Sequence, residues 1–181
     1  MKTPVILALC SAAFISGATL PVFAETESKG RSSQPGQVGA MENEKMFIQK
    51  AGPAGMAEVE LAQAATKKGT SEHVKTVAAQ LVTDHTKANT ELAELAKAKG
   101  VPIPAPTEKE KKMHDAVLKK SGAEFDAAFL DAMSMCHKKD IALFEKASRE
   151  LKDPDLKAFV DKTLPVLKSH AEMIAAPVSK N

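Results

Sequence analysis

The sequence predicts an all-α protein built as a bundle of four long helices, and three observations support this. Beyond residue 42 the chain consists largely of Ala, Lys, Glu, Leu and Met, which favour helices, while Gly and Pro stand mainly between the helical segments. Apolar residues in these segments recur at alternating steps of three and four, the spacing of one buried stripe on a helix. No segment alternates apolar and polar residues with β-branched enrichment, so we expect no sheet.

Five helices are predicted from these stripes and from the signals that start and stop helices. Ser71 and Thr107 are suited to N-cap positions, and Pro154 to a first helical turn. Proline inside a helix loses a backbone hydrogen bond at a cost of about 3 kcal/mol, so we expect a kink or short break at Pro53 and a kink at Pro165. The predicted helices cover about residues 43–68, 71–99, 108–120, 122–151 and 154–176.

The connection between the second long helix and the third is long enough to run the whole length of the bundle. A helix of about 28 residues is about 42 Å long, and about seven extended residues plus a helix of about 13 residues span a similar distance. A crossover of this kind is typical of ferritin-like folds. The sequence therefore predicts a ferritin-like four-helix bundle whose long crossover carries a short extra helix. A simple up-down bundle with the short helix as a lid is the alternative.

The beginning of the chain has the features of a secretory signal peptide over residues 1–24. A basic residue precedes an almost unbroken apolar run, and small or apolar residues suit cleavage after Ala24. An uncleaved membrane anchor is the alternative, but Ser and Gly interrupt the run and Pro21 closes it. Residues 25–41 are polar and lack periodicity, so we expect a disordered leader ahead of a bundle domain at 42–178.

Composition limits the location and the partners of the protein. No segment after the signal approaches the about 20 apolar residues that cross a bilayer, so we expect an exported protein of the periplasm or cell envelope, without a transmembrane span. The formal net charge is +2, and Trp and Tyr are absent, which argues against a nucleic-acid partner. Cleavage would remove Cys10 and leave Cys136 alone, and we expect it to be a buried, unreactive thiol without a disulfide.

Four polar residues fall on or beside the apolar stripes of the four long helices. Glu58, His85 and His170 stand where the spacing requires a core residue, and His137 is close to such a position. With a ferritin-like crossover, all four fall in the middle third of the bundle. One carboxylate and three imidazoles together predict a site for a metal ion, with Zn, Fe, Mn or Cu as candidates. A single histidine on such a stripe is more often a hydrogen-bonded core residue, so the prediction depends on the coincidence of four.

Two more specific metal sites are disfavoured. Di-iron bundles use a Glu-x-x-His motif on each of two helices, and this motif does not occur in the sequence. Met133, Met135 and Cys136 beside His137 offer soft ligands for Cu(I). However, residues 133 and 135 lie about 200° apart around a helix, which makes a shared ion difficult.

Several motifs together are similar to those of a known family. Residues 56–61 read MAEVEL, 84–89 read DHTKAN, 144–147 read FEKA and 163–170 read TLPVLKSH. These segments resemble the bacterial "domain of unknown function 4142" family over about residues 42–176. The resemblance implies an exported, ferritin-like four-helix protein with no established activity. The sequence departs from the family pattern at Cys136, where an Asp normally precedes the second histidine.

The sequence favours a non-enzymatic bundle protein that serves envelope stress or metal handling. Its metal ligands would be Glu58, His85, His137 and His170. One alternative is a metal-dependent oxidoreductase that uses the same pocket, which turnover with peroxide or superoxide would reveal. The other is a structural or interaction module in which the polar cluster only fixes the helix register, and metal content would distinguish it from the first two.

Overall fold

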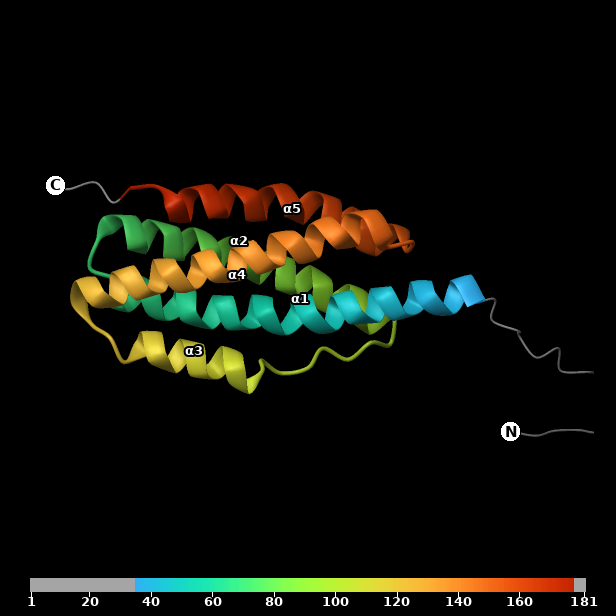
Figure 1. The fold of residues 1–181 in the computed structure, drawn as a ribbon, viewed down its shortest axis with the longest axis horizontal. Coiled ribbons are helices and arrows are strands. Elements are labelled where there is room, and N and C mark those ends of the chain that lie inside the picture. The colour runs from blue at the N-terminus through green and yellow to red at the C-terminus, as the bar shows by residue number, and fades with distance from the viewer. Residues whose placement is uncertain (1–34, 178–181) are drawn as a thin grey trace, which may run out of the picture. The chain divides into compact units, whose positions relative to one another are not determined.

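The computed structural model describes residues 35–177 and confirms the all-α fold. This part of the chain contains no strand and five helices: α1 (Pro35–Lys68), α2 (Glu72–Ala98), α3 (Glu108–Leu118), α4 (Gly122–Glu150) and α5 (Pro154–Ala175). The four long helices lie along one another, and the short helix α3 lies beside them (Figure 1). Among these helices none has both the length and the apolar character to cross a membrane.

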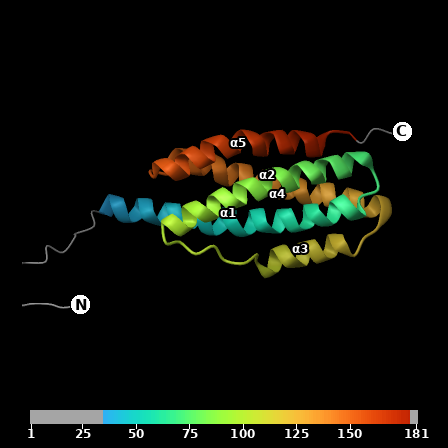
Figure 2. The ribbon, with the colours of Figure 1, turned by 180° about the vertical axis from the view of Figure 1, so that it is seen from behind.

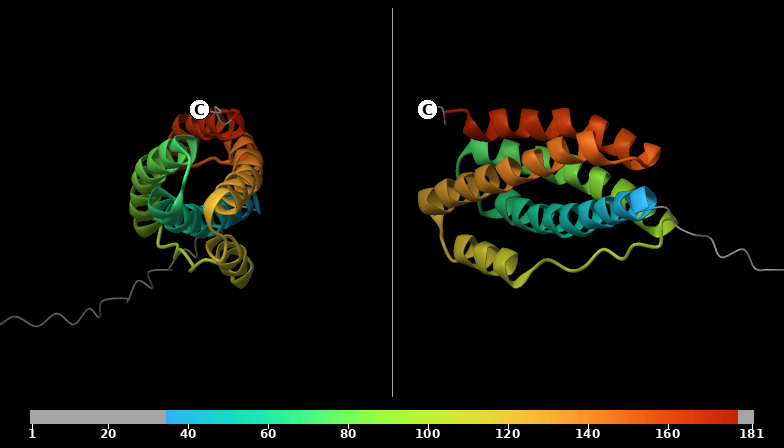
Figure 3. Two further views of the ribbon diagram at one scale, coloured as in Figure 1. Left: turned by 90° about the vertical axis from the view of Figure 1, so that its left-hand side faces the viewer. Right: turned by 45° about the vertical axis from the view of Figure 1, so that its right-hand side comes forward.

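The long helices form a ring in which neighbouring helices are antiparallel. Both α1 and α5 pack against α2 and α4, so α1 is diagonal to α5 and α2 to α4. Figure 3 shows this ring end on, with α3 outside it against α1 and α4. The link that follows α2 runs back along the bundle to α3 before α4 begins, as Figure 2 shows from behind. This is the crossover predicted for a ferritin-like bundle.

The start of α1 differs from the prediction. The helix begins at Pro35, so residues 35–41, which the sequence analysis assigned to the disordered leader, are helical. Proline is compatible with a first helical turn because its missing N–H has no partner there in any case. The predicted signal peptide at 1–24 and the rest of the leader lie outside the described residues.

Neither internal proline interrupts its helix. The helix α1 is continuous through Pro53, so the short break considered there does not form, and α5 is continuous through Pro165. Close packing explains the continuity of α1, because Gly52 and Gly55 lie directly against the side chains of Ile103 and Asn89. A Cβ atom at Gly52 would lie 2.5 Å from Ile103 Cγ2, and one at Gly55 would force the Asn89 side chain to move. Tertiary packing of this face therefore outweighs the local cost of the proline.

The core consists of two apolar clusters with one polar layer between them. One cluster contains Phe125 and Phe129, and the other contains Phe47, Phe144 and Phe159. On each long helix the residues that enter one cluster are separated from those that enter the other by one buried polar residue. These residues, in chain order, are Glu58, His85, His137 and His170.

One buried carboxylate on α4 binds the turn between α1 and α2 at one end of the bundle. Asp126, in the first turns of α4, accepts hydrogen bonds from the backbone N–H groups of Thr70 (2.9 Å) and Ser71 (2.7 Å) and from the Thr70 hydroxyl (2.7 Å). Burial opposes ionisation of Asp126, but these hydrogen bonds outweigh it and lower the pKa of the carboxyl group. The turn between α1 and α2 is thus held by the start of α4.

Replacing Asp126 by alanine is expected to lower the free energy of unfolding by about 2–3 kcal/mol, because three donors lose a charged acceptor. A carboxyl group whose pKa is lowered by folding stabilises the protein above its unfolded pKa of about 3.9, and this contribution is lost as pH falls through the folded pKa. Urea unfolding at neutral and acidic pH measures both effects. Replacing the exposed Asp131 on the same helix is the control, and an equal loss in that variant would contradict the assignment.

Candidate metal centre

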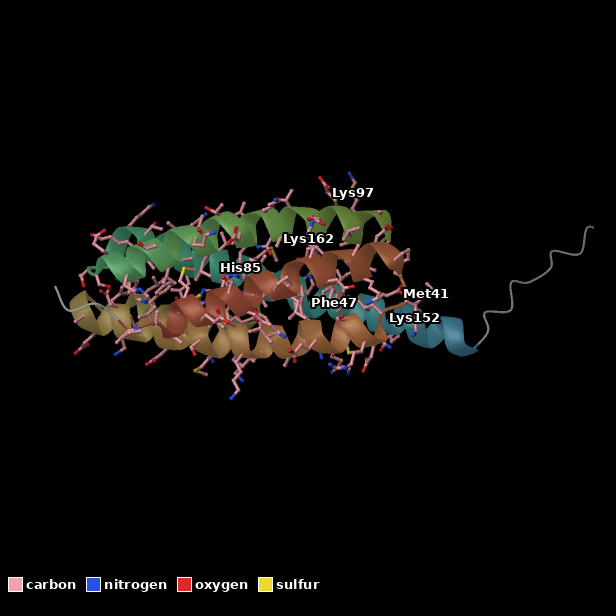
Figure 4. The ribbon with its side chains drawn as sticks, turned by 90° about the horizontal axis from the view of Figure 1, so that it is seen from above. Met41, Phe47, His85, Lys97, Lys152 and Lys162 are labelled. Carbon is pink, nitrogen blue, oxygen red and sulfur yellow. The ribbon has the colours of Figure 1, made fainter. Side chains whose placement is uncertain are left out.

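Three histidine side chains from three helices meet in the polar layer. His85 comes from α2, His137 from α4 and His170 from α5, and they are 6%, 0% and 2% exposed. The Nε2 atom of His137 lies 3.3 Å from His85 Nε2 and 3.3 Å from His170 Nδ1. One ring nitrogen of each residue lies within 4.8 Å of the other two. Figure 4 labels His85, which lies about midway along the bundle.

Hydrogen bonds outside the cluster fix which nitrogen of two rings carries a proton. The Nδ1 atom of His137 lies 3.0 Å from the carbonyl oxygen of Met133, and the Nε2 atom of His170 lies 2.9 Å from Oδ2 of Asp84. A carbonyl oxygen can only accept a hydrogen bond. The Asp84 carboxylate also only accepts, because hydrogen bonds from Gln80 and His170 outweigh burial and lower the pKa of Asp84. Both nitrogens therefore donate. This leaves the opposite nitrogens, His137 Nε2 and His170 Nδ1, facing into the cluster, and in a neutral ring that nitrogen is the acceptor.

The interior of the cluster disfavours an additional proton on His85 and on His137. Burial, followed by the charges of the neighbouring imidazoles, lowers the pKa of His85 to about 3, and burial with His170 lowers the pKa of His137 to about 4. Both rings are thus neutral at pH 7 and would have no proton to release before binding a cation. Neutral imidazoles whose outer N–H groups are held by a carboxylate or a carbonyl are typical ligands of transition metals.

The spacing of the nitrogens suits a tetrahedral ion. Ligand nitrogens 2.0–2.1 Å from a tetrahedral ion lie about 3.3 Å from one another. Two of the three nitrogen pairs of the cluster are 3.3 Å apart. The three-histidine cluster could therefore hold a metal ion with little rearrangement.

The fourth predicted ligand, Glu58, borders this cluster from α1. Its side chain is 1% exposed, and Oε2 lies 3.3 Å from His85 Nε2 and 3.8 Å from His137 Nδ1. Burial, and then the charge of Asp140, raise the pKa of Glu58 well above its usual value. Burial also raises the pKa of Asp140. Glu58, beside the histidine layer, and its neighbour Asp140 are thus two carboxyl groups that are costly to ionise together without a cation.

The sulfur-rich alternative for Cu(I) is not assembled. Met133 is fully buried in one apolar cluster, whereas Met135 is 56% exposed. Cys136 is half-buried, which corrects the expectation of a buried thiol. Its side chain lies one helical position from His137 and faces the space between α4, α1 and α3 rather than the apolar core.

The Cys136 thiol is expected to react slowly with thiol reagents in the native protein. Burial and the nearby charges of Glu58 and Asp140 raise its pKa to about 12. Because the thiolate is the reactive form, the reaction at pH 8 should be about 1000-fold slower than that of a free cysteine with a pKa near 8.5. Labelling with a chromogenic disulfide before and after unfolding in urea measures the ratio. Equal labelling rates in the native and the unfolded protein would show that the native thiol is ionised and accessible to the reagent.

The sequence pattern predicts the four residues of the polar layer but not the groups that support them. Asp84 precedes His85 in the chain, yet it serves His170, and only the packing of α2 against α5 brings this pair together. Asp140 follows His137 by less than one helical turn, a spacing that could have placed it near Glu58. His114 on α3 is also buried, at 7% exposure, and its position depends on how the crossover docks.

Comparisons with known proteins agree with this fold and place the chain in a family. A solved structure described as the crystal structure of a DUF305 fragment from Deinococcus radiodurans is similar, with a TM-score of 0.65 and 12% sequence identity over 73% of this chain and 92% of that one. This likeness concerns the fold alone. No curated protein sequence matches the chain. The family model described as "Domain of unknown function (DUF4142)" matches residues 29–176, which confirms the resemblance seen in the motifs. The chain belongs to this DUF4142 family.

Proposed function

We propose that this protein is an exported, non-enzymatic bundle that holds one transition-metal ion in its core and serves metal handling or envelope stress. The observation that carries the proposal is the convergence of three buried imidazoles, in which His137 Nε2 lies 3.3 Å from a ring nitrogen of each of the other two. A single cation between these nitrogens would be bound by all three rings at once. The proposed ligands are His85, His137 and His170, with Glu58 as the fourth.

Each supporting group has a distinct part in holding the ion. Asp84 orients the His170 ring and increases its basicity, while the Met133 carbonyl orients His137. Glu58 supplies the negative charge that imidazole ligands lack, and its carboxylate is adjacent to His85. A bound ion would supply a fixed positive charge with Lewis-acid character. The two apolar clusters on either side would keep water away from it.

The donor set favours Zn, Fe, Mn or Cu over Mg or Ca. Imidazole suits Zn, Cu and Fe, and a carboxylate in addition keeps Mn among the candidates. The DUF4142 match leaves the activity open. Export is part of the proposal and rests on the signal-like sequence of residues 1–24.

Elemental analysis of the protein purified from the cell envelope tests this function directly. The expected result is about one equivalent of a single first-row transition metal per chain, removable by a chelator and restored by adding the metal. Cell fractionation tests the location in the same preparation. Protein that is purified without metal and takes up none from solution would support the purely structural alternative.

A further inference from the structure

The short helix α3 covers a pocket against α1 and α4. The pocket has a volume of about 550 Å³. Alanine and methionine side chains form part of its wall. The wall also contains five groups that can act as metal ligands, Glu58, Glu110, His114, Cys136 and Asp140. Three of these groups come from α1 or α4 and two from α3, so the docking of the crossover completes the pocket.

Two buried polar groups of this wall lack hydrogen-bond partners among the described residues. These are the Nε2 atom of His114 and both oxygens of the ionised Glu58 carboxylate, whose neighbours Asp140 and Cys136 could bond to it only by contributing a proton. Glu58 is 1% exposed and His114 is 7% exposed. Buried polar groups in folded proteins almost always have a partner, so unpaired groups in the wall of a pocket indicate that a ligand binds there.

The charges of the wall favour a cation as this ligand. Asp140 lies in the same pocket wall as Glu58, so two carboxyl groups, one from α4 and one from α1, face one enclosed space. Two carboxylates in a poorly solvated space are stabilised together only by a proton or a cation between them. Glu110 on α3 adds a third acidic group. Lys109 and Lys139 also belong to the wall, but both are exposed, so solvent screens their charges.

Glu58 connects this pocket with the histidine cluster. It belongs to the pocket wall, and its Oε2 atom lies 3.3 Å from His85 Nε2. A second pocket, between α2 and α5, approaches the cluster from another side, but it is smaller, at about 120 Å³. That pocket reaches Asp84, whose carboxylate is already bonded to His170. The pocket under α3 therefore offers the better route for an ion to the core.

We propose that the pocket under α3 is a second cation site, at which a divalent metal ion binds Glu58 and Asp140 before it moves to the three imidazoles. This inference rests on the proposed function, because it describes how the core site is loaded. The carboxylates replace part of the water shell of the incoming ion, and hard oxygen ligands hold it weakly enough to release it. Glu58 then serves both sites, which explains why a buried carboxylate without hydrogen-bond partners is placed between them.

The first experiment tests the loading site without the core site. In a His137→Ala protein the histidine cluster lacks its central ligand, so Mn²⁺ should bind only weakly, at the pocket. The loss of the free Mn²⁺ signal in electron paramagnetic resonance measures this binding. Adding Asp140→Asn should abolish it. The proposal is wrong if His137→Ala binds no Mn²⁺, or if the second substitution changes nothing.

The second experiment tests the route. Stopped-flow absorption follows the uptake of Co²⁺ by the metal-free protein at low ionic strength, and a chelator follows its release. Asp140→Asn should slow uptake and release alike by about three- to tenfold, because removing an acidic group weakens attraction for the ion along the path. The equilibrium affinity should stay within about twofold. Glu110→Gln should act in the same direction, and it keeps the capping box with Thr107 because glutamine also caps.

A matched control distinguishes the two pockets. Glu91 lines the smaller pocket near Asp84, so Glu91→Gln removes one charge from the competing route. It should leave the rate of Co²⁺ uptake unchanged. If Glu91→Gln slows uptake and the α3-pocket variants do not, the ion enters from the other side and the inference is wrong. The proposed function fails separately, if the unaltered protein binds Co²⁺ no more tightly than His137→Ala.

Discussion

Replacing His137 by alanine is expected to lower the affinity for a transition-metal ion by well over 100-fold, since loss of a group that merely supports a ligand already costs 10–100-fold. His137 is the central member of the cluster, with its Nε2 atom 3.3 Å from both other imidazoles. In the His137→Ala protein only His85 and His170 remain as imidazole ligands, and α4 no longer contributes one. Competition with a chromogenic chelator measures the affinity.

The same substitution should remove the stabilisation that the metal gives the fold. An ion at 100 times its dissociation constant stabilises a protein by about 2.7 kcal/mol, and this gain should disappear in His137→Ala. His73 on α2 provides a matched control, because it lies on a helix of the bundle but outside the three-histidine cluster. Equal metal-dependent stabilisation of the His137→Ala and His73→Ala proteins would show that the ion binds elsewhere.

The fold could be predicted from the sequence because each long helix carries its own local signals. The stripes of apolar residues, the cap at Ser71 and the capping box at Thr107 all form as expected. The ends of the helices were less predictable. Residues 35–41 have a polar, glycine-containing sequence without a stripe, and they are helical as an extension of a helix that packing stabilises further along.

The polar layer could be predicted because buried polar residues interrupt a regular pattern, whereas its surroundings could not. Glu58 and the three histidines are recognisable since each replaces an apolar residue on a stripe. The pairing of Asp84 with His170 depends on how α2 and α5 are rotated about their axes. The role of Glu58 likewise depends on α3, since the docking of the crossover decides whether this carboxylate meets solvent or a pocket. Neither property is encoded in local periodicity.

Replacing Glu58 by leucine is expected to stabilise the metal-free protein by about 1–3 kcal/mol while weakening metal binding. A buried carboxyl group whose oxygens have no hydrogen-bond partner is costly, and an apolar side chain of similar size removes this cost. In the metal-bound protein the same substitution removes a negative charge beside the ion. Urea unfolding with a chelator and with added metal measures the two effects, which should have opposite signs.

The pH dependence of the gain provides a further check. Folding raises the pKa of Glu58 above its value of about 4.3 in the unfolded chain. The cost of the buried carboxyl group to the native state therefore grows as pH rises from about 4.3 to the higher pKa of the folded protein, and it is fully present above that pKa. The advantage of Glu58→Leu should therefore be largest at neutral pH and should shrink toward pH 4, where the carboxyl group is protonated in both states. Glu58→Gln is the control, because its neutral amide avoids the charge but still needs hydrogen-bond partners. If Glu58→Leu instead lowers the stability of the metal-free protein at neutral pH, Glu58 supports the fold itself and its placement needs no metal to explain it.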